Sequence, residues 1–191
     1  MRILYVASGM QIPGSHGGSV HAPELCRALS RAGHEVHLIS LPPDNPVDAA
    51  VDLDGVLLHP LRTRPLIAQF DMFHWREVKR LAGQIGPDIV VERFYTFGGR
   101  GLIAAVQLGL PAVLKVNSPA LPYPGSLRDR LDTLTLIKPI HRWRQWMLGQ
   151  ARRYYATSEL LLPEHLRDRT TVIVNGVNCQ LFQPGEPAPD K

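Results

Sequence analysis

The sequence has few of the signatures that identify common protein classes. Its 191 residues include only two cysteines, Cys26 and Cys179, which form neither a metal-binding spacing nor a disulfide framework. We predict that both are reduced packing residues, the alternative being one bridge between them. No run approaches the roughly 18 apolar residues of a membrane span, and a strand pattern starts at Arg2 in place of a signal peptide. We therefore expect a cytoplasmic protein.

Two nucleotide-binding motifs are also missing. The loop after the first predicted strand carries Gly9, Gly14, Gly17 and Gly18, which do not form G-x-G-x-x-G. The second predicted strand ends in Leu-Ile-Ser at 38–40, without the acidic residue that would bind the ribose hydroxyls of NAD. The sequence also lacks the G-K-[ST] of a P-loop. These absences disfavour a nicotinamide-dependent dehydrogenase or another Rossmann nucleotide enzyme, and a nucleoside triphosphatase.

The composition and the order of apolar segments indicate a folded α/β domain. Hydrophobic residues are 45% and charged residues 20%, as in ordinary globular proteins. Strand and helix patterns alternate, which predicts a Rossmann-like doubly wound parallel sheet of about seven strands with helices on both faces. The strands are predicted at 2–8, 35–40, 55–60, 88–93, 111–117, 153–158 and 171–175, and the main helices at 20–32, 70–85, 99–109 and 139–151.

In such a sheet, ligands bind at the carboxyl ends of the strands. The net charge of +4 is uneven, because residues 96–191 contain 12 basic and 7 acidic side chains, whereas residues 1–95 contain 9 and 10. This asymmetry suits an anionic partner, although it also occurs on surfaces without a specific partner.

The glycine loop is the first candidate site. Gly17 and Gly18 have no side chains to hinder a ligand, and the helix behind them presents unpaired N–H groups with partial positive charge. Pro23 fits in the first turn of that helix. A diphosphate could approach closely here. The alternative is that the glycines serve only the geometry of the turn.

Three passages of the chain resemble family 4 retaining glycosyltransferases, which have the two-domain GT-B fold. The first is Pro13, Gly17-Gly18 and "GHEV" at 33–36. The second is "DIVVERFYTFGGRGLIAAVQLGLPAVLKVNSP" at 88–119, and the third is "VIVNGVNCQLFQP" at 172–184. The resemblance implies a GT-B amino-terminal domain over 1–178, with 179–191 leading into a carboxy-terminal donor-binding domain.

The resemblance also implies a function. In that family the amino-terminal domain binds the acceptor, the carboxy-terminal domain binds a nucleotide-sugar, and transfer retains the anomeric configuration. Gly17, Gly18 and Ser19 would approach the donor diphosphate. We expect a UDP- or GDP-linked donor, a glycan, lipid-linked or small-molecule acceptor, no other cofactor, no metal and no nucleic acid. The 191-residue chain is expected to transfer no sugar alone. The alternative function is a stand-alone, non-catalytic glycan- or nucleotide-binding module.

Other candidates follow the predicted strands. Asn117 and Ser118 stand where many relatives have a histidine near the reacting sugar, so we predict a catalytic-cleft role; an amide cannot act as a general base, and the alternative is a plain turn. Glu92 and Arg93 could bind acceptor hydroxyls or phosphate, or pair with charges at the sheet rim. His16 is a further acceptor-binding candidate.

Three segments complete the predictions. Asn175, Gly176 and Val177 would form the interdomain junction at the cleft. In the segment 137–153, a helical wheel places Trp146 beside arginines on an outer face, where it could meet an anionic membrane surface or a lipid-linked acceptor, or make a cation–π pair. We also expect the loops 8–19 and 121–130 to be open.

The eight histidines form no convincing metal-binding pattern. His16 and His21 flank the glycine pair, and His34 and His37 lie around the second predicted strand, but no third ligand is evident for either pair. We therefore predict that the protein has no metal site.

Overall fold

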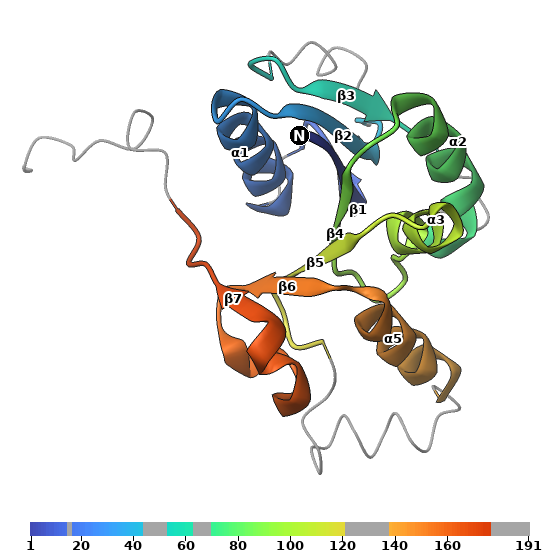
Figure 1. Cartoon of the computed structure of the whole chain (residues 1–191), viewed down its shortest axis with the longest axis vertical. Coiled ribbons are helices and arrows are strands. Elements are labelled where there is room, and N and C mark those ends of the chain that lie inside the picture. The colour runs from blue at the N-terminus through green and yellow to red at the C-terminus, as the bar shows by residue number, and fades with distance from the viewer. Residues whose placement is uncertain (15–16, 44–52, 63–69, 121–137, 177–191) are drawn as a thin grey trace, which may run out of the picture.

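A computed structural model describes residues 1–14, 17–43, 53–62, 70–120 and 138–176 of the chain. Its centre is a seven-stranded parallel sheet in the order β3-β2-β1-β4-β5-β6-β7 (Figure 1). The chain runs outward from β1 to β3, returns to the other side of β1 at β4, and then continues outward to β7. The carboxyl ends of β1 and β4 therefore flank the point where the strand order reverses, which is where such sheets bind ligands.

The observed elements match the predicted ones closely, and the predicted fold class is confirmed. The strands are β1 (Arg2–Gln11), β2 (Glu35–Leu41), β3 (Leu57–Pro60), β4 (Ile89–Arg93), β5 (Ala112–Val116), β6 (Arg153–Ala156) and β7 (Thr170–Val172). The helices are α1 (Gly17–Arg31), α2 (Trp75–Ile85), α3 (Arg100–Leu108) and α5 (Lys138–Gln150), with 3₁₀ segments η3 (Asp71–His74), η4 (Glu159–Leu161) and η5 (Glu164–Arg169).

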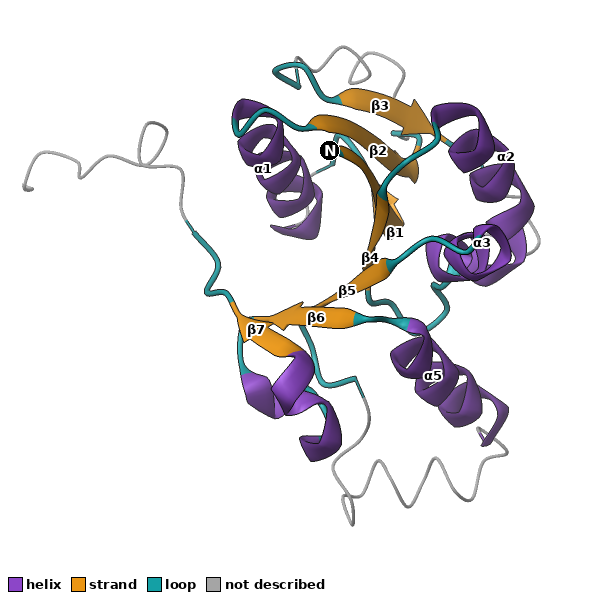
Figure 2. Ribbon diagram, viewed as in Figure 1, coloured by secondary structure: helices purple, strands orange, loops and turns teal. Residues whose placement is uncertain are grey.

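Helices cover the sheet unequally in the described part of the chain. Helix α1 packs on one face through Ala22 and Cys26, in a cluster with Tyr5 and Leu38 (Figure 2). Helices α2, α3 and α5 pack on the opposite face, where the larger cluster includes Leu102. The two faces are called the α1 face and the α3 face below. Cys26 is a free thiol with no exposed surface, which confirms its predicted packing role; Cys179 lies outside the described residues.

Strand β1 extends further than predicted. Ser8 and Ile12 have no exposed surface, and Gln11 still pairs with Leu41 of β2 after an irregularity in register. Gly9 adopts a positive φ of 68°, a conformation that glycine reaches without strain, and this lets the chain bend and continue along the sheet. The prediction of an open loop from residue 8 is therefore wrong for 8–12. The other predicted loop, 121–130, lies outside the described residues.

A buried carboxylate fixes the carboxyl edge of the sheet. Glu92 on β4 is fully buried, and its Oε1 atom accepts hydrogen bonds from the Ser8 hydroxyl on β1 and from the Gly99 amide at 2.6 Å. Its Oε2 atom accepts from the Leu102 amide at 2.6 Å. The two amides belong to the start of α3, where N–H groups lack partners within the helix and favour negative charge. Glu92 thus connects β1, β4 and α3.

A second buried charge pair lies on the same face. Asp71 of η3 and Arg100 of α3 are 1% and 0% exposed, and the Arg100 Nε atom lies 3.1 Å from the Asp71 Oδ2 atom. Burial raises the pKa of Asp71, whereas the Arg100 charge acts in the opposite direction. The pair holds η3 against the first turn of α3, and removing either partner would leave an uncompensated buried charge.

Replacement of a helical glycine by alanine should change the stability of the domain in opposite directions at Gly101 and Gly83. A Cβ atom at Gly101 in α3 would lie 2.7 Å from Val6 Cγ2 and 3.0 Å from Glu92 Oε2, whereas one at Gly83 in α2 would meet nothing within 4 Å. We expect Gly83→Ala to stabilise the domain by about 1 kcal/mol through helix propensity. Gly101→Ala should destabilise it by about 1–3 kcal/mol because the buried strand must shift. Urea unfolding of both variants measures the difference, and equal effects would contradict the close packing of α3 on β1.

The stability of the domain should depend on pH through Glu92. Burial raises its pKa from 4.5 to about 7, against the opposing effect of its three donors. Between these values Glu92 is protonated in the folded state but ionised in the unfolded state. Its contribution to the free energy of unfolding is therefore complete below pH 4.5 and is lost as the pH rises to about 7. Glu92→Gln removes the titration. The stability advantage of the wild type over this variant should therefore shrink from pH 5 to pH 8 by about 2–3 kcal/mol.

Denaturant unfolding across this pH range measures the effect. Glu159→Gln, the same substitution at an exposed position, is the control. An advantage that grows with pH would mean that the three donors outweigh burial and hold the Glu92 carboxylate charged.

Candidate functional site

The carboxyl edge of the sheet brings together most of the residues predicted from the sequence. Arg93 ends β4, Asn117 and Ser118 follow β5, and Asn175 and Gly176 follow β7. Because parallel strands place their carboxyl ends along one edge, these segments face the same side of the molecule (Figure 1).

The two glycines at the start of α1 have different surroundings. A Cβ atom at Gly17 would meet nothing within 4 Å, so this backbone borders open space. At Gly18 it would lie 2.4 Å from Met10 Cε, the end of a flexible side chain, so Gly18 packs closely against β1 and a side chain here would displace Met10. Ser19 is 4% exposed and faces the protein. Of the predicted loop, Gly17 is thus the residue that a ligand can approach; His16 lies outside the described residues.

Asn117 and Ser118 are exposed directly after β5, as a role in a cleft requires. Ala120, three residues further on, is fully buried, and its amide donates a 3.0 Å hydrogen bond to the Leu161 carbonyl. The short exposed stretch is therefore held at both ends, by β5 and by Ala120. The contact of Asn117 and Ser118 with substrate stays a prediction.

Glu92 and Arg93 are both predicted to bind the acceptor, but their side chains lie on opposite faces of the sheet. Successive side chains of a strand alternate, so Glu92 points to the α3 face and Arg93 to the α1 face. The fully buried Glu92 carboxylate is inaccessible to an acceptor, and its position corrects the binding role predicted for it: it positions α3. Arg93 is half-buried, and its Nη1 atom donates to the Ser8 carbonyl at 3.2 Å.

The structure adds two basic residues that the sequence reasoning did not assign to the site. Lys115 lies opposite Arg93 in the register of β5 and β4, so both side chains share the α1 face. Its Nζ atom is 2.6 Å from Nδ1 of His21 on α1. The signal available in the sequence was that Lys115 interrupts the otherwise apolar segment that forms β5.

Neutral side chains surround this basic cluster, which consists of Arg93, Lys115 and His21. The Lys115 ammonium lies over the Tyr155 ring, 5.5 Å from its centroid. Burial raises the pKa of Tyr155, and it raises that of Cys26 to about 12, so both groups stay uncharged at neutral pH.

The charge states within the cluster follow from burial and from mutual repulsion. Burial, together with the Arg93 charge, lowers the pKa of Lys115 to about 8, so the amine is still mostly protonated at neutral pH. Burial, and then the Lys115 charge, lowers the pKa of His21. A neutral His21 accepts a hydrogen bond from Lys115 at Nδ1 and keeps its own proton on Nε2.

The predicted junction reaches the same cluster. The Asn175 side chain lies close enough to His21 to raise its pKa against the effect of burial, so the segment after β7 lies beside α1 although the two are far apart in sequence. Asn175 and Gly176 are exposed, and Val177 lies outside the described residues.

The helical-wheel assignment of Trp146 to an outer face is corrected. Trp146 stacks on Trp143 with ring centroids 4.7 Å apart, and both are partly buried against the core of the α3 face. The Trp143 Nε1 atom donates to the Gly98 carbonyl at 3.1 Å, which anchors α5 next to the turn before α3. Trp146 therefore has a packing role. Contact of the segment 137–153 with an anionic membrane stays a hypothesis, in which its arginines would make the contact.

The described residues contain no cluster of three or more metal-ligating side chains. His37, on β2, lies between His59 Nε2 at 2.9 Å and Glu35 Oε1 at 3.0 Å. This hydrogen-bonded row runs from Glu35 at the amino end of β2 to His59 of β3, which pairs in register with Ile39. Within the described part of the chain, no helix is long and apolar enough to span a membrane.

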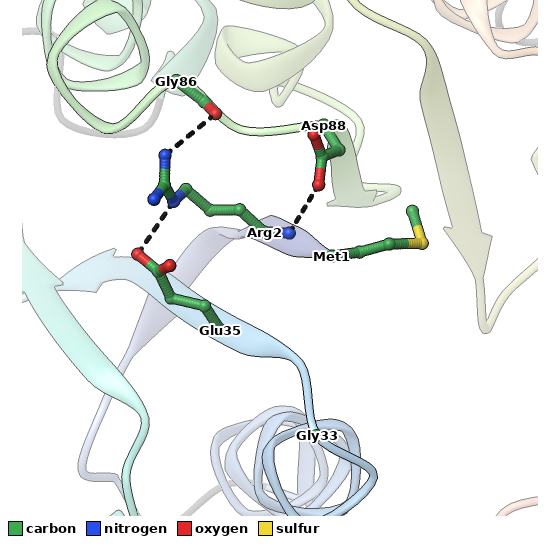
Figure 3. A pocket seen from close by; sticks show the side chains of 6 residues that line it. All are labelled: Met1, Arg2, Gly33, Glu35, Gly86 and Asp88. Atoms are coloured by element: carbon green, nitrogen blue, oxygen red, sulfur yellow. Dashed lines mark hydrogen bonds and ion pairs between the residues drawn. The ribbon is translucent and has the colours of Figure 1, made fainter.

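A pocket occurs at the other end of the sheet. It is lined by Met1, Arg2, Gly33, Glu35, Gly86 and Asp88, residues that precede or begin strands (Figure 3). Its polar groups are paired with one another: the Arg2 Nε atom donates to Glu35 at 2.8 Å, and the Arg2 amide donates to Asp88 at 2.7 Å (Figure 3). The pocket lies at the edge opposite to the candidate site, and its pairing suits the anchoring of strand ends.

Solved structures with a similar fold include HepE, MurG and a UDP-GlcNAc 2-epimerase. HepE from Anabaena, solved with UDP-glucose, superposes with a TM-score of 0.65 at 15% identity, over 97% of this chain and 47% of its own. MurG from Acinetobacter baumannii gives 0.57 at 18% identity, over 93% and 46%. UDP-GlcNAc 2-epimerase from Methanocaldococcus jannaschii gives 0.57 at 16%, over 92% and 46%.

The chain spans about half the length of these structures, and at such identities the likeness establishes the fold alone. No curated protein is significantly similar to the chain in sequence. The decisive match is to the model of Glycosyltransferase Family 4, which covers residues 15–181, nearly the whole chain. Together with the confirmed GT-B-like sheet, this match shows that the chain belongs to glycosyltransferase family 4.

Proposed function

We propose that the chain is the acceptor-binding half of a retaining glycosyltransferase that moves a sugar from a nucleotide-sugar to a glycan, lipid-linked or small-molecule acceptor. The family match supports glycosyl transfer, and one structural observation supports the location of the reaction. Gly17 borders open space at the start of α1, on the same sheet edge as the exposed Asn117. A substrate can reach the backbone of α1 there without displacing a side chain.

The donor assignment draws on the solved relatives. HepE was crystallised with UDP-glucose and with UDP, which supports a nucleotide-sugar partner for this chain, linked to UDP or GDP. The amino end of α1 offers N–H groups and partial positive charge to a diphosphate, and Gly17 keeps that approach open. The proposal requires no metal, because backbone donors and basic side chains can stabilise the charge of the leaving diphosphate.

In the proposed reaction the bond between the anomeric carbon and the donor diphosphate breaks, and a bond to the acceptor oxygen forms on the same face of the sugar. The acceptor proton passes to the leaving diphosphate oxygen. Asn117 cannot take this proton, but its amide can donate a hydrogen bond to a sugar hydroxyl or to a phosphate oxygen. The chain's contribution is therefore orientation and charge stabilisation.

The remaining parts of the proposal concern context. A second, donor-binding domain would complete the cleft, as suggested by the chain spanning about half the length of its solved relatives. The chain alone would then transfer no sugar. A cytoplasmic location stays a prediction.

The proposal is tested by assaying transfer from labelled UDP- and GDP-sugars to a panel of acceptors, with the chain alone and joined to a family 4 donor-binding domain. We expect transfer by the joined protein only. Transfer by the 191-residue chain alone would contradict its assignment as a half-site. Ligand binding without transfer in every joined form would favour the non-catalytic module.

The role of Gly17 is tested in the joined protein by Gly17→Val. The added side chain meets no atom of the domain within 4 Å of its Cβ, so folding should be unaffected, but it would occupy the path of the diphosphate. We expect turnover to fall by about a hundredfold or more. Gly83→Val, on the equally open α2 position, is the matched control and should keep normal turnover. Normal kinetics in Gly17→Val would refute the role of this glycine.

A further inference from the structure

The basic cluster is unusual because like charges are adjacent in register and partly buried. Arg93 and Lys115 are paired positions on neighbouring parallel strands, and side chains at such positions are close neighbours. Lys115 is 2% exposed, and Arg93 Nε is buried without a hydrogen-bond partner among the described residues. Cations removed from water in this way cost free energy unless an opposite charge compensates them.

The described residues supply no such compensation. The groups that face the cluster are Tyr5, Cys26 and Tyr155, which burial keeps protonated, and His21, which approaches Lys115 through a ring nitrogen. The nearest carboxylate in sequence, Glu92, points to the opposite face of the sheet and is fully used by its own donors. No salt bridge of Arg93 or Lys115 is formed with the described acidic residues.

The position of the basic cluster in the sheet also favours ligand binding. Arg93 ends β4, Lys115 is the penultimate residue of β5, and His21 is on the first turns of α1, so the charges lie at the carboxyl edge. The exposed Asn117 is two residues beyond Lys115, and the exposed Asn175 lies beside His21. An anion bound there would meet the guanidinium, the imidazole N–H and the side-chain amides, with the Lys115 charge directly behind the imidazole.

We propose that Arg93, Lys115 and His21 form a subsite for an oxyanion, a phosphate or carboxylate, carried by the acceptor. The assignment to the acceptor depends on the proposed function, which gives this domain the acceptor. The subsite disfavours neutral sugars as acceptors. The acceptor is instead an acidic sugar, a sugar phosphate or a phosphate-bearing lipid head group. Arg93 binds the oxyanion directly, and Lys115 acts as a positioning residue through His21.

Inorganic phosphate is the probe for the subsite. Thermal unfolding of the 191-residue chain is followed while phosphate replaces chloride at constant ionic strength, since a ligand of the folded state raises the unfolding temperature. The wild type should be stabilised by phosphate. Lys115→Met should be more stable than the wild type without phosphate, because a buried cation is replaced by an apolar chain of similar length, and it should bind phosphate about tenfold more weakly or worse.

Lys79→Met, which makes the same charge change on α2, is the matched control and should keep the full phosphate response. An equal response in Lys115→Met, or no response in the wild type beyond that to chloride, would overturn the subsite. If Lys115→Met fails to fold, Arg93→Gln tests the same claim, with loss of the response expected and a full response contradicting it.

Titration of phosphate in the presence of saturating UDP separates the two sources of oxyanion. An undiminished phosphate response supports the acceptor, and competition by UDP overturns that assignment in favour of the donor diphosphate. These measurements involve no sugar transfer, so the failure of the subsite leaves the proposed transfer reaction untouched. A chain that binds phosphate, but transfers no sugar when joined to a donor domain, fails in the proposed function alone.

Discussion

The carboxylate of Glu92 is the constraint on which the candidate site depends. Its three donors come from β1 and from the start of α3, so one side chain fixes the two strands at the reversal of strand order and the helix that covers them. The next residue, Arg93, must then point to the α1 face. The position of the guanidinium at the sheet edge follows from the burial of its acidic neighbour.

The two faces of the sheet carry opposite charge at this edge. Glu92 and Asp71 lie on the α3 face, where the start of α3 and the Arg100 guanidinium compensate them. Arg93 and Lys115 lie on the α1 face, without an acidic partner in the described part of the chain. Charges that are satisfied within the fold serve its stability, whereas those that are not satisfied are the ones available to a substrate. This contrast separates the structural polar residues from the functional candidates.

Much of the fold could be predicted from the sequence because the strands are short apolar runs and glycines closely follow the helices α1, α2 and α3. The direction of Glu92 could not be predicted, because both faces of this sheet are covered and period-two alternation does not say which face is which. The length of β1 was missed because Gly9 looks like the start of a loop but allows a bend within the strand. Trp146 was misplaced because a helical wheel ignores the size of the Trp143 ring on which it stacks.

The basic cluster was missed for a different reason. His21 and Lys115 are 94 positions apart in the sequence, with Arg93 between them, and no local motif connects the three residues. Their proximity comes from the pairing of β4 with β5 and from the placement of α1 over these strands. The composition reveals the surplus of basic residues in the second half of the chain. Only the pairing of β4 with β5 shows that two of the cations are neighbours.

The central claim is that substrates bind at the carboxyl edge of the sheet. The most direct measurement is the change of backbone amide NMR signals of the isotope-labelled chain during titration with UDP-glucose and, separately, GDP-mannose. One of these donors should shift the signals of Gly17, Asn117 and Asn175, even where binding is weak. Shifts confined to the opposite edge, at Gly33 and Gly86 of the amino-end pocket, would contradict it.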